Sequence, residues 1–189
     1  MEIVDVVATR FGDRPVPADL SALVAIPSGE DSPFNHVEIE FIEPGRGHPL
    51  LDHSYLNDND RANPDIMANV AAIDEVLRHA VFVASDGDDN LYGYWLHHDE
   101  PAGPPAVVCF SSEGQFSIEG GSLTEAMISS RAFDEEEFAR LAQVFVDAGV
   151  PITARSLGEF AEPAVVTSPA DLHDRLYRAE RAKRGLPDF

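Results

Sequence analysis

The sequence predicts an α+β fold, with a mostly antiparallel twisted sheet flanked by helices and a C-terminal helical extension. Two observations predict it. Short apolar strands with polar or Gly-containing links crowd residues 81–118. These links are too short for parallel crossovers, which need a dozen or more residues. Segments with a helical apolar period then fill much of residues 122–184.

The composition is typical of a soluble protein with its own core. A chain of 189 residues with 44% apolar content can bury that core without disulfides or metals. Cys109 has no partner cysteine, which suits a reducing cytoplasm. No apolar run reaches the roughly 20 residues of a membrane span. Residues 1–5 lack the basic start of a signal peptide. We therefore expect a cytoplasmic protein.

The first third of the chain mixes short elements and loops. Residues 3–8 fit either a strand or a short helix, and residues 18–25 predict a short helix between prolines. Val37–Phe41 alternates apolar and acidic residues, the period of a half-buried strand. Residues 44–62 are rich in Gly, Pro, Asn and Asp, which predicts a long irregular loop.

A longer helix follows over about residues 64–79. Asn63 can cap it, and Pro64 suits its first position. Its apolar face recurs at helical spacing through Ile66, Val70, Ile73 and Leu77.

The middle of the chain predicts four strands, namely Val81–Ala84, Leu91–Leu96, Ala106–Phe110 and Gln115–Ile118. The polar link at 85–90 predicts a hairpin between the first two. We expect Cys109 in the core, together with Val81, Val83, Val107 and Phe138. A buried cysteine is a packing residue, so its thiol should react slowly.

Three helices are predicted after the strands, over about 122–130, 134–148 and 169–184. Ser122 and Glu125 match a capping box, and Asp134 can cap the second helix. Phe133 and Phe138 are spaced for a hydrophobic staple. Ser168 and Pro169 open the third helix, whose basic residues gather at its C-terminal end, where they suit the helix dipole.

The charge is unusually negative. Thirteen basic residues stand against 34 acidic ones, a net charge of −21, and residues 1–167 hold 8 basic against 30 acidic, or −22. Such a chain repels nucleic acid and anionic membranes and attracts a basic partner. A charge that serves only solubility is the alternative interpretation.

No motif for catalysis or cofactor binding is present. The sequence contains no G-x-S-x-G elbow and no Gly-rich phosphate loop. Its only lysine is Lys183, near the C-terminus, which excludes lysine chemistry from the body of the chain. We therefore predict no catalytic residue and no cofactor.

We also predict no metal site. Asp86, Asp88 and Asn90 begin like a calcium loop, but Leu91 occupies the position that needs Gly and His97 the position of the bidentate Glu.

Histidines give only a weak metal signal. His97 and His98 are neighbours, and on a strand they would point to opposite faces. His48, Asp52 and His53 share a loop without the spacing of a helical His pair.

Residues 82–96 resemble the central hairpin of the SUKH superfamily. That hairpin consists of an apolar strand, a D-G-x-[GD]-[DN] turn and an aromatic-rich strand. Residues 105–110 resemble that family's P-V-V strand, 112–114 its acidic-Gly turn and 122–130 its following helix. Val16–Leu20 resembles its L-P-x-x-[LY] helix start. The resemblance covers about residues 15–130. It divides the chain into a SUKH-like domain at 1–130 and a helical extension at 131–189, packed on the same domain.

The resemblance implies function by binding. Many bacterial SUKH members are immunity proteins that neutralise polymorphic toxins, often nucleases, and fungal members are cell-wall regulators that act through partner proteins. The superfamily shares no catalytic residues. For this chain it implies a non-enzymatic immunity protein with a basic toxin as partner.

The candidate contact surface lies in two acidic links of the sheet. We expect Asp86, Asp88 and Asp89 in the hairpin turn to lie close to Asp99 and Glu100 in the next loop. Carboxylates there could occupy the phosphate-contacting Arg and Lys of a nuclease and speed its capture. A solvated acidic rim is the alternative interpretation.

Two other functions are compatible with the sequence, which specifies neither the partner nor the oligomeric state. A small enzyme could use carboxylates and histidines of the loops at 44–62 and 97–100, with a divalent metal. A regulatory scaffold could dock another subunit on the C-terminal helices.

Overall fold

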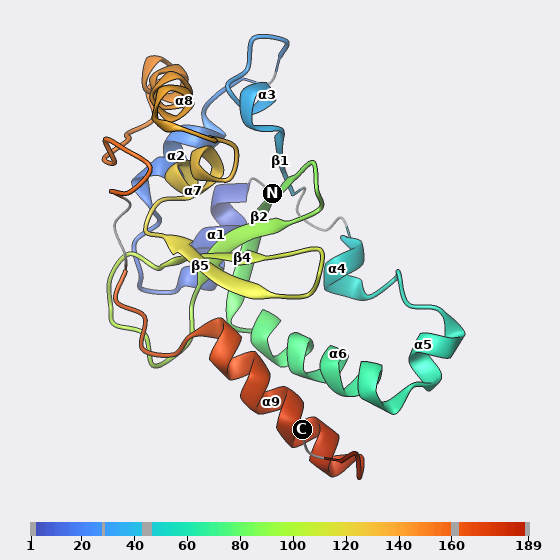
Figure 1. Ribbon diagram of the computed structural model, residues 1–189. Helices are drawn as coiled ribbons and strands as arrows, with labels where there is room; N and C mark the ends of the chain where they lie inside the picture. The colour runs from blue at the N-terminus through green and yellow to red at the C-terminus, as the bar shows by residue number, and fades with distance from the viewer. Residues whose placement is uncertain (1–2, 28, 43–46, 160–162, 188–189) are drawn as a thin grey trace.

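The computed structural model describes residues 3–27, 29–42, 47–159 and 163–187, and the predicted α+β fold is confirmed. In these residues five strands form one sheet in sequence order, with every neighbouring pair antiparallel (Figure 1). The strands are β1 (Ile39–Phe41), β2 (Ala80–Asp86), β3 (Leu91–Trp95), β4 (Val107–Phe110) and β5 (Phe116–Gly120).

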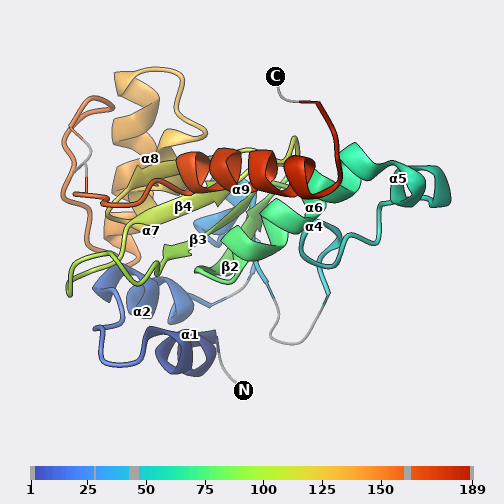
Figure 2. The same cartoon turned by 90° about the horizontal axis from the view of Figure 1, so that it is seen from below.

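Helices cover both faces of the sheet. One face packs on α1 (Ile3–Phe11), α2 (Ala18–Val24), α7 (Leu123–Ser129) and α8 (Glu135–Asp147). The other packs on α6 (Pro64–Leu77) and α9 (Pro169–Lys183), which lie side by side (Figures 1 and 2). The short helices are α3 (Phe34–Val37), α4 (Pro49–Asp52) and α5 (Asp58–Ala62). None of the described helices combines the length and apolarity needed to cross a membrane.

The central strands alternate between two cores. In β3, Tyr92 and Tyr94 pack in the core formed with α1, α2, α7 and α8, whereas Leu91 and Trp95 pack in the core formed with α6 and α9. Every residue of β3 and β4 is buried. The predicted C-terminal extension contributes to both cores, because α8 lies on one face and α9 on the other.

In the first third, the structure decides one open alternative and corrects the start of the predicted strand. Residues 3–8 belong to a helix, α1. Val37 ends α3 and is not part of a strand, because Glu38 adopts a left-handed conformation, φ 52°, and β1 begins only at Ile39.

The predicted loop at 44–62 contains two helices, α4 and α5, while its residues 44–46 lie outside the described residues. Its polar composition reflects caps rather than irregular structure. The Asn57 side chain accepts from the backbone N–H groups of Asn59 and Asp60, and the Asp60 carboxylate accepts from the N–H of Asn57.

The predicted helix starts are largely confirmed. The side chains of Asn63, Ser122, Asp134 and Ser168 all accept a backbone N–H of the following helix. The prediction of a hydrophobic staple is wrong, because Phe133 is 94% exposed and cannot pack on Phe138.

Cys109 is buried, as predicted, and so are Val81, Val83, Val107 and Phe138. Burial raises the pKa of the Cys109 thiol to about 12, so the thiolate is scarce at neutral pH. We therefore expect Ellman's reagent to modify native Cys109 at least about 100 times more slowly than the urea-unfolded chain. Equal rates for the native and unfolded chains would contradict a packing role.

Candidate functional site

The two acidic links predicted to form one contact surface lie at opposite ends of β3. The hairpin turn at 87–90 precedes β3, and the loop at 97–105 follows it. Five residues of strand, at about 3.3 Å each, separate the two links. The prediction that these carboxylates lie together is therefore wrong. In an antiparallel meander, successive links alternate between the two ends of the sheet.

Asp86 is not a contact residue, because it is 8% exposed and its carboxylate already accepts four hydrogen bonds. The donors are the backbone N–H of Asp88 at 3.0 Å, the N–H and side-chain amide of Asn90 at 2.9 and 3.0 Å, and the Tyr92 hydroxyl at 3.2 Å. Asp86 thus organises the hairpin turn.

Asp88 and Asp89 are exposed and belong to what we call the hairpin surface, formed by Glu38, Asp88, Asp89 and Arg131. The Arg131 guanidinium lies 3.3 Å from the Glu38 carboxylate and 3.6 Å from that of Asp88, and its Nε donates to the Val37 carbonyl at 3.1 Å. Arg131 therefore positions two carboxylates with a single positive charge, so this group keeps a net negative charge. No sequence pattern pointed to Glu38 or Arg131, since both are brought in by tertiary packing.

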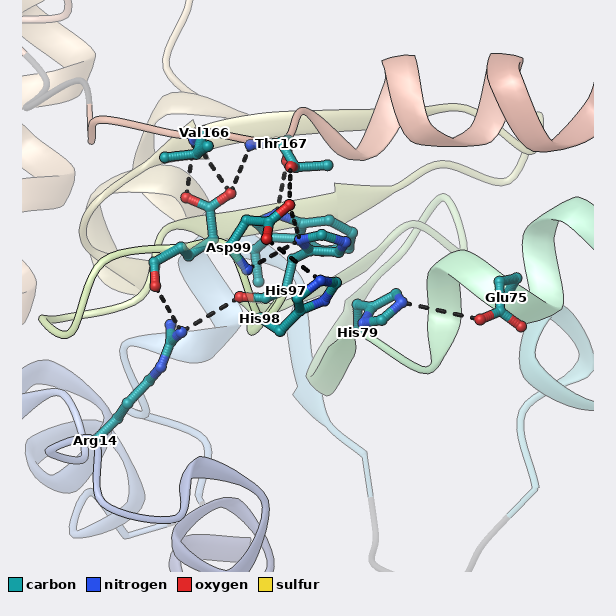
Figure 3. A network of polar contacts seen from close by, with 10 residues as sticks. Arg14, Glu75, His79, His97, His98, Asp99, Val166 and Thr167 are labelled. Atoms are coloured by element: carbon teal, nitrogen blue, oxygen red, sulfur yellow. Dashed lines mark hydrogen bonds and ion pairs between the residues drawn. The ribbon is translucent and has the colours of Figure 1, made fainter.

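Glu100 has a structural role at the far end of β3. Its carboxylate accepts from the N–H groups of Val166, at 3.0 and 3.1 Å, and Thr167, at 2.8 Å (Figure 3). The Trp95 indole donates to the Thr167 carbonyl at 2.9 Å. These hydrogen bonds hold the segment that leads into α9 against the end of β3. The Glu100 carboxylate is therefore not free to bind a partner.

Beside Glu100, the structure brings together three imidazoles, those of His79, His97 and His98, which we call the histidine cluster (Figure 3). Within the described residues, one ligand atom from each ring lies within 4.8 Å of the other two. The ring centroid of His97 lies 4.6 Å from that of His79 and 4.2 Å from that of His98.

The expectation that His97 and His98 point to opposite faces of a strand is wrong, because β3 ends at Trp95. The pairing of β2 with β3 explains the cluster. Ala80 pairs with Trp95, and the Leu96 N–H donates to the His79 carbonyl at 2.7 Å. The two chain segments just outside the base of the hairpin are thus adjacent, which brings His79 close to His97 and His98.

Burial and the neighbouring imidazoles lower the pKa of two rings in this cluster, those of His79 and His97. Burial lowers the pKa of His79, and the neighbouring His97 ring lowers it further. Burial and His98 likewise lower the pKa of His97, whose ring is stacked on Trp95 with centroids 5.8 Å apart. Neutral imidazole is the form that ligates metal ions.

Two carboxylates flank the histidine cluster. Asp99 Oδ1 lies 3.3 Å from His98 Nε2, and Asp99 Oδ2 lies 3.7 Å from His97 Nδ1. Glu75 Oε1, on α6, lies 4.0 Å from His79 Nε2 (Figure 3).

Two cavities lined by described residues bear on the alternative enzyme, and neither joins the loops at 44–62 and 97–100. His48 and Tyr55 line a cavity of about 420 Å³, but residues 97–100 do not line it. A second cavity, of about 490 Å³, holds Asp19 and Glu125. Both carboxylates are committed to protein hydrogen bonds, Asp19 to the N–H of Thr124 and Glu125 to the N–H groups of 153 and 154.

No protein-family model, curated protein or solved structure matches this chain.

Proposed function

We propose that this protein is a non-catalytic binding protein of the immunity type, which captures a basic toxin such as a nuclease through the hairpin surface. The observation that carries the proposal is the geometry of Glu38 and Asp88. Their side chains are 67% and 74% exposed, yet Arg131 holds both in place from a largely buried position. A preorganised carboxylate loses less conformational entropy on binding a cation than a freely rotating one.

The charge of the chain supports a basic partner. With −22 on residues 1–167, a cationic protein is attracted over the Debye length, about 8–10 Å at physiological salt. Such steering raises the rate of encounter, whereas close contacts set the lifetime of the complex.

Phe133 supplies an apolar group close in sequence to these charges. It lies two residues after Arg131, its side chain is 94% exposed, and Asp134 beside it is also exposed. Aromatic side chains are enriched among the residues that contribute most to protein interfaces, where polar groups surround them. The resemblance of residues 81–130 to the SUKH superfamily agrees with this mode of action.

The contact set is therefore revised to Glu38, Asp88, Asp89 and Phe133. Asp86, Asp99 and Glu100 are left out, because hydrogen bonds within the protein occupy them.

We expect a basic protein to be captured from native cell extract by the immobilised wild-type chain. A variant carrying Glu38→Gln, Asp88→Asn and Asp89→Asn should capture it at least about tenfold less, since each lost exposed ion pair weakens binding and steering together. Asn suits position 89, where φ is 62°, because Asn tolerates left-handed backbone. Quantitative mass spectrometry measures the captured amount.

The matched control removes three charges elsewhere, through Asp13→Asn, Asp58→Asn and Asp174→Asn on the α1–α2 link, α5 and α9. All three residues are exposed, so this variant has the same net charge as the hairpin variant. It should capture the partner like the wild type. Equal capture by all three baits would contradict the proposal, as would the capture of acidic proteins only.

A further inference from the structure

The histidine cluster has a composition that a charge-driven binding protein does not require. Three imidazoles from two separate chain segments converge on one point, and one of them, His97, is only 6% exposed. Their nitrogen lone pairs suit late first-row divalent metals.

The distances are compatible with coordination after a small movement. Zinc–imidazole bonds of about 2.0–2.1 Å place tetrahedral ligand atoms about 3.3 Å apart. The cluster's ligand atoms are already within 4.8 Å of one another. The His98 side chain is 76% exposed, so it can rotate toward the other two rings without repacking the core.

The backbone under the cluster is fixed. His79 lies between α6 and β2, and its carbonyl accepts the Leu96 N–H at 2.7 Å. The Arg14 guanidinium donates to the carbonyls of His97 and Glu100, at 3.3 and 3.1 Å, which holds the second segment (Figure 3). A site built on fixed backbone loses little entropy when it binds an ion.

The flanking carboxylates complete the environment of a metal centre. Metal-bound histidines commonly donate their second ring nitrogen to a carboxylate, which orients the ring and raises its basicity. Asp99 lies 3.3 Å from one nitrogen of His98, and Glu75 lies 4.0 Å from one nitrogen of His79. Each of these two rings can therefore bind an ion through one nitrogen and face a carboxylate with the other.

We propose that His79, His97 and His98 bind one late first-row divalent metal ion, Zn²⁺ or its chemical neighbours Co²⁺, Ni²⁺ and Cu²⁺. The bound ion would join the end of α6 to the loop after β3. The proposal is independent of the hairpin surface, which lies at the other end of β3.

Trp95 provides a direct readout of this site. It is the only tryptophan in the chain, and its ring centroid lies 5.8 Å from that of His97 and 6.0 Å from that of His79. Co²⁺, with a partly filled d shell, should quench its fluorescence from this distance. Zn²⁺, with a filled d shell, should displace Co²⁺ and restore the emission.

The experiment titrates CoCl₂ into the full chain after EDTA treatment and dialysis. We expect saturable quenching at one ion per chain, reversed by ZnCl₂. His98→Ala should raise the dissociation constant for Co²⁺ at least about tenfold, because one of three ligands is lost. The control His36→Ala removes an exposed histidine from α3 and should leave the constant unchanged.

A second measurement separates binding from nonspecific quenching. Zn²⁺ at about 100 times its dissociation constant should raise the melting temperature of the wild type by about 5–10 °C. The same concentration is at most about ten times the dissociation constant of His98→Ala, so it should raise the melting temperature of that variant by no more than about half as much. Quenching of His98→Ala with the dissociation constant of the wild type, or a wild type with neither quenching nor a thermal shift, would overturn the proposal.

Discussion

Gly93→Ala is expected to destabilise the protein by about 4 kcal/mol or more, a large effect for the addition of a single methyl group. A Cβ at Gly93 would lie 2.1 Å from the Val81 carbonyl oxygen and 2.6 Å from the Phe82 Cα. Both atoms are backbone of the neighbouring strand, so no side-chain rotation can relieve the clash. The strands come this close because β2 carries an irregularity, in which the pairing skips Val83 between Phe82 and Ala84.

Urea unfolding followed by Trp95 fluorescence measures this loss. The matched control is Gly103→Ala, in the loop after β3, where an added Cβ meets no atom within 4 Å. Its free energy of unfolding should stay within about 0.5 kcal/mol of the wild type. A Gly93→Ala protein that unfolds at the wild-type urea concentration would show that β2 and β3 are not paired as described.

Asp86→Ala is expected to lower the free energy of unfolding by about 2–4 kcal/mol. The substitution removes a buried acceptor and leaves four hydrogen-bond donors without a partner. The donors belong to the turn residues Asp88 and Asn90 and to Tyr92 in β3. The stabilities of Asp86→Ala and Asp88→Ala form a matched pair from one turn. The Asp88 side chain is 74% exposed, so solvent screens its ion pair with Arg131 and its loss should cost less than about 1 kcal/mol.

Chemical denaturation of the two variants measures the difference. If both cost the same, Asp86 is an ordinary surface carboxylate and belongs in the contact set after all. That outcome would restore the interpretation of Asp86, Asp88 and Asp89 as a single acidic patch.

The fold was predictable where local signals were strong. Strand lengths and polar links predicted the meander of β2 to β5, and caps such as Asn63 and Asp134 predicted helix starts to within a residue. These signals depend on contacts within a few residues of each other. The prediction of an irregular loop at 44–62 failed because Asn57 and Asp60, which are typical loop residues, form a capping box at the start of α5.

The functional surfaces were less predictable, because they depend on the ends of strands. Asp86 and Asp88 are two residues apart in one turn, yet one is buried and the other exposed. Nothing local distinguishes them. Tertiary packing sets the partners of Arg131, and strand register sets the approach of His79 to His97; sequence patterns specify both only weakly.

The proposed capture of a basic partner is tested most directly by the rate at which that partner associates with the chain as salt is raised. Between about 50 and 500 mM salt the wild-type rate should fall steeply, because screening removes steering. The variant at Glu38, Asp88 and Asp89 should associate about tenfold more slowly at low salt and show a flatter dependence. The variant at Asp13, Asp58 and Asp174 should remain close to the wild type. Identical rates and slopes for all three proteins would contradict binding at the hairpin surface.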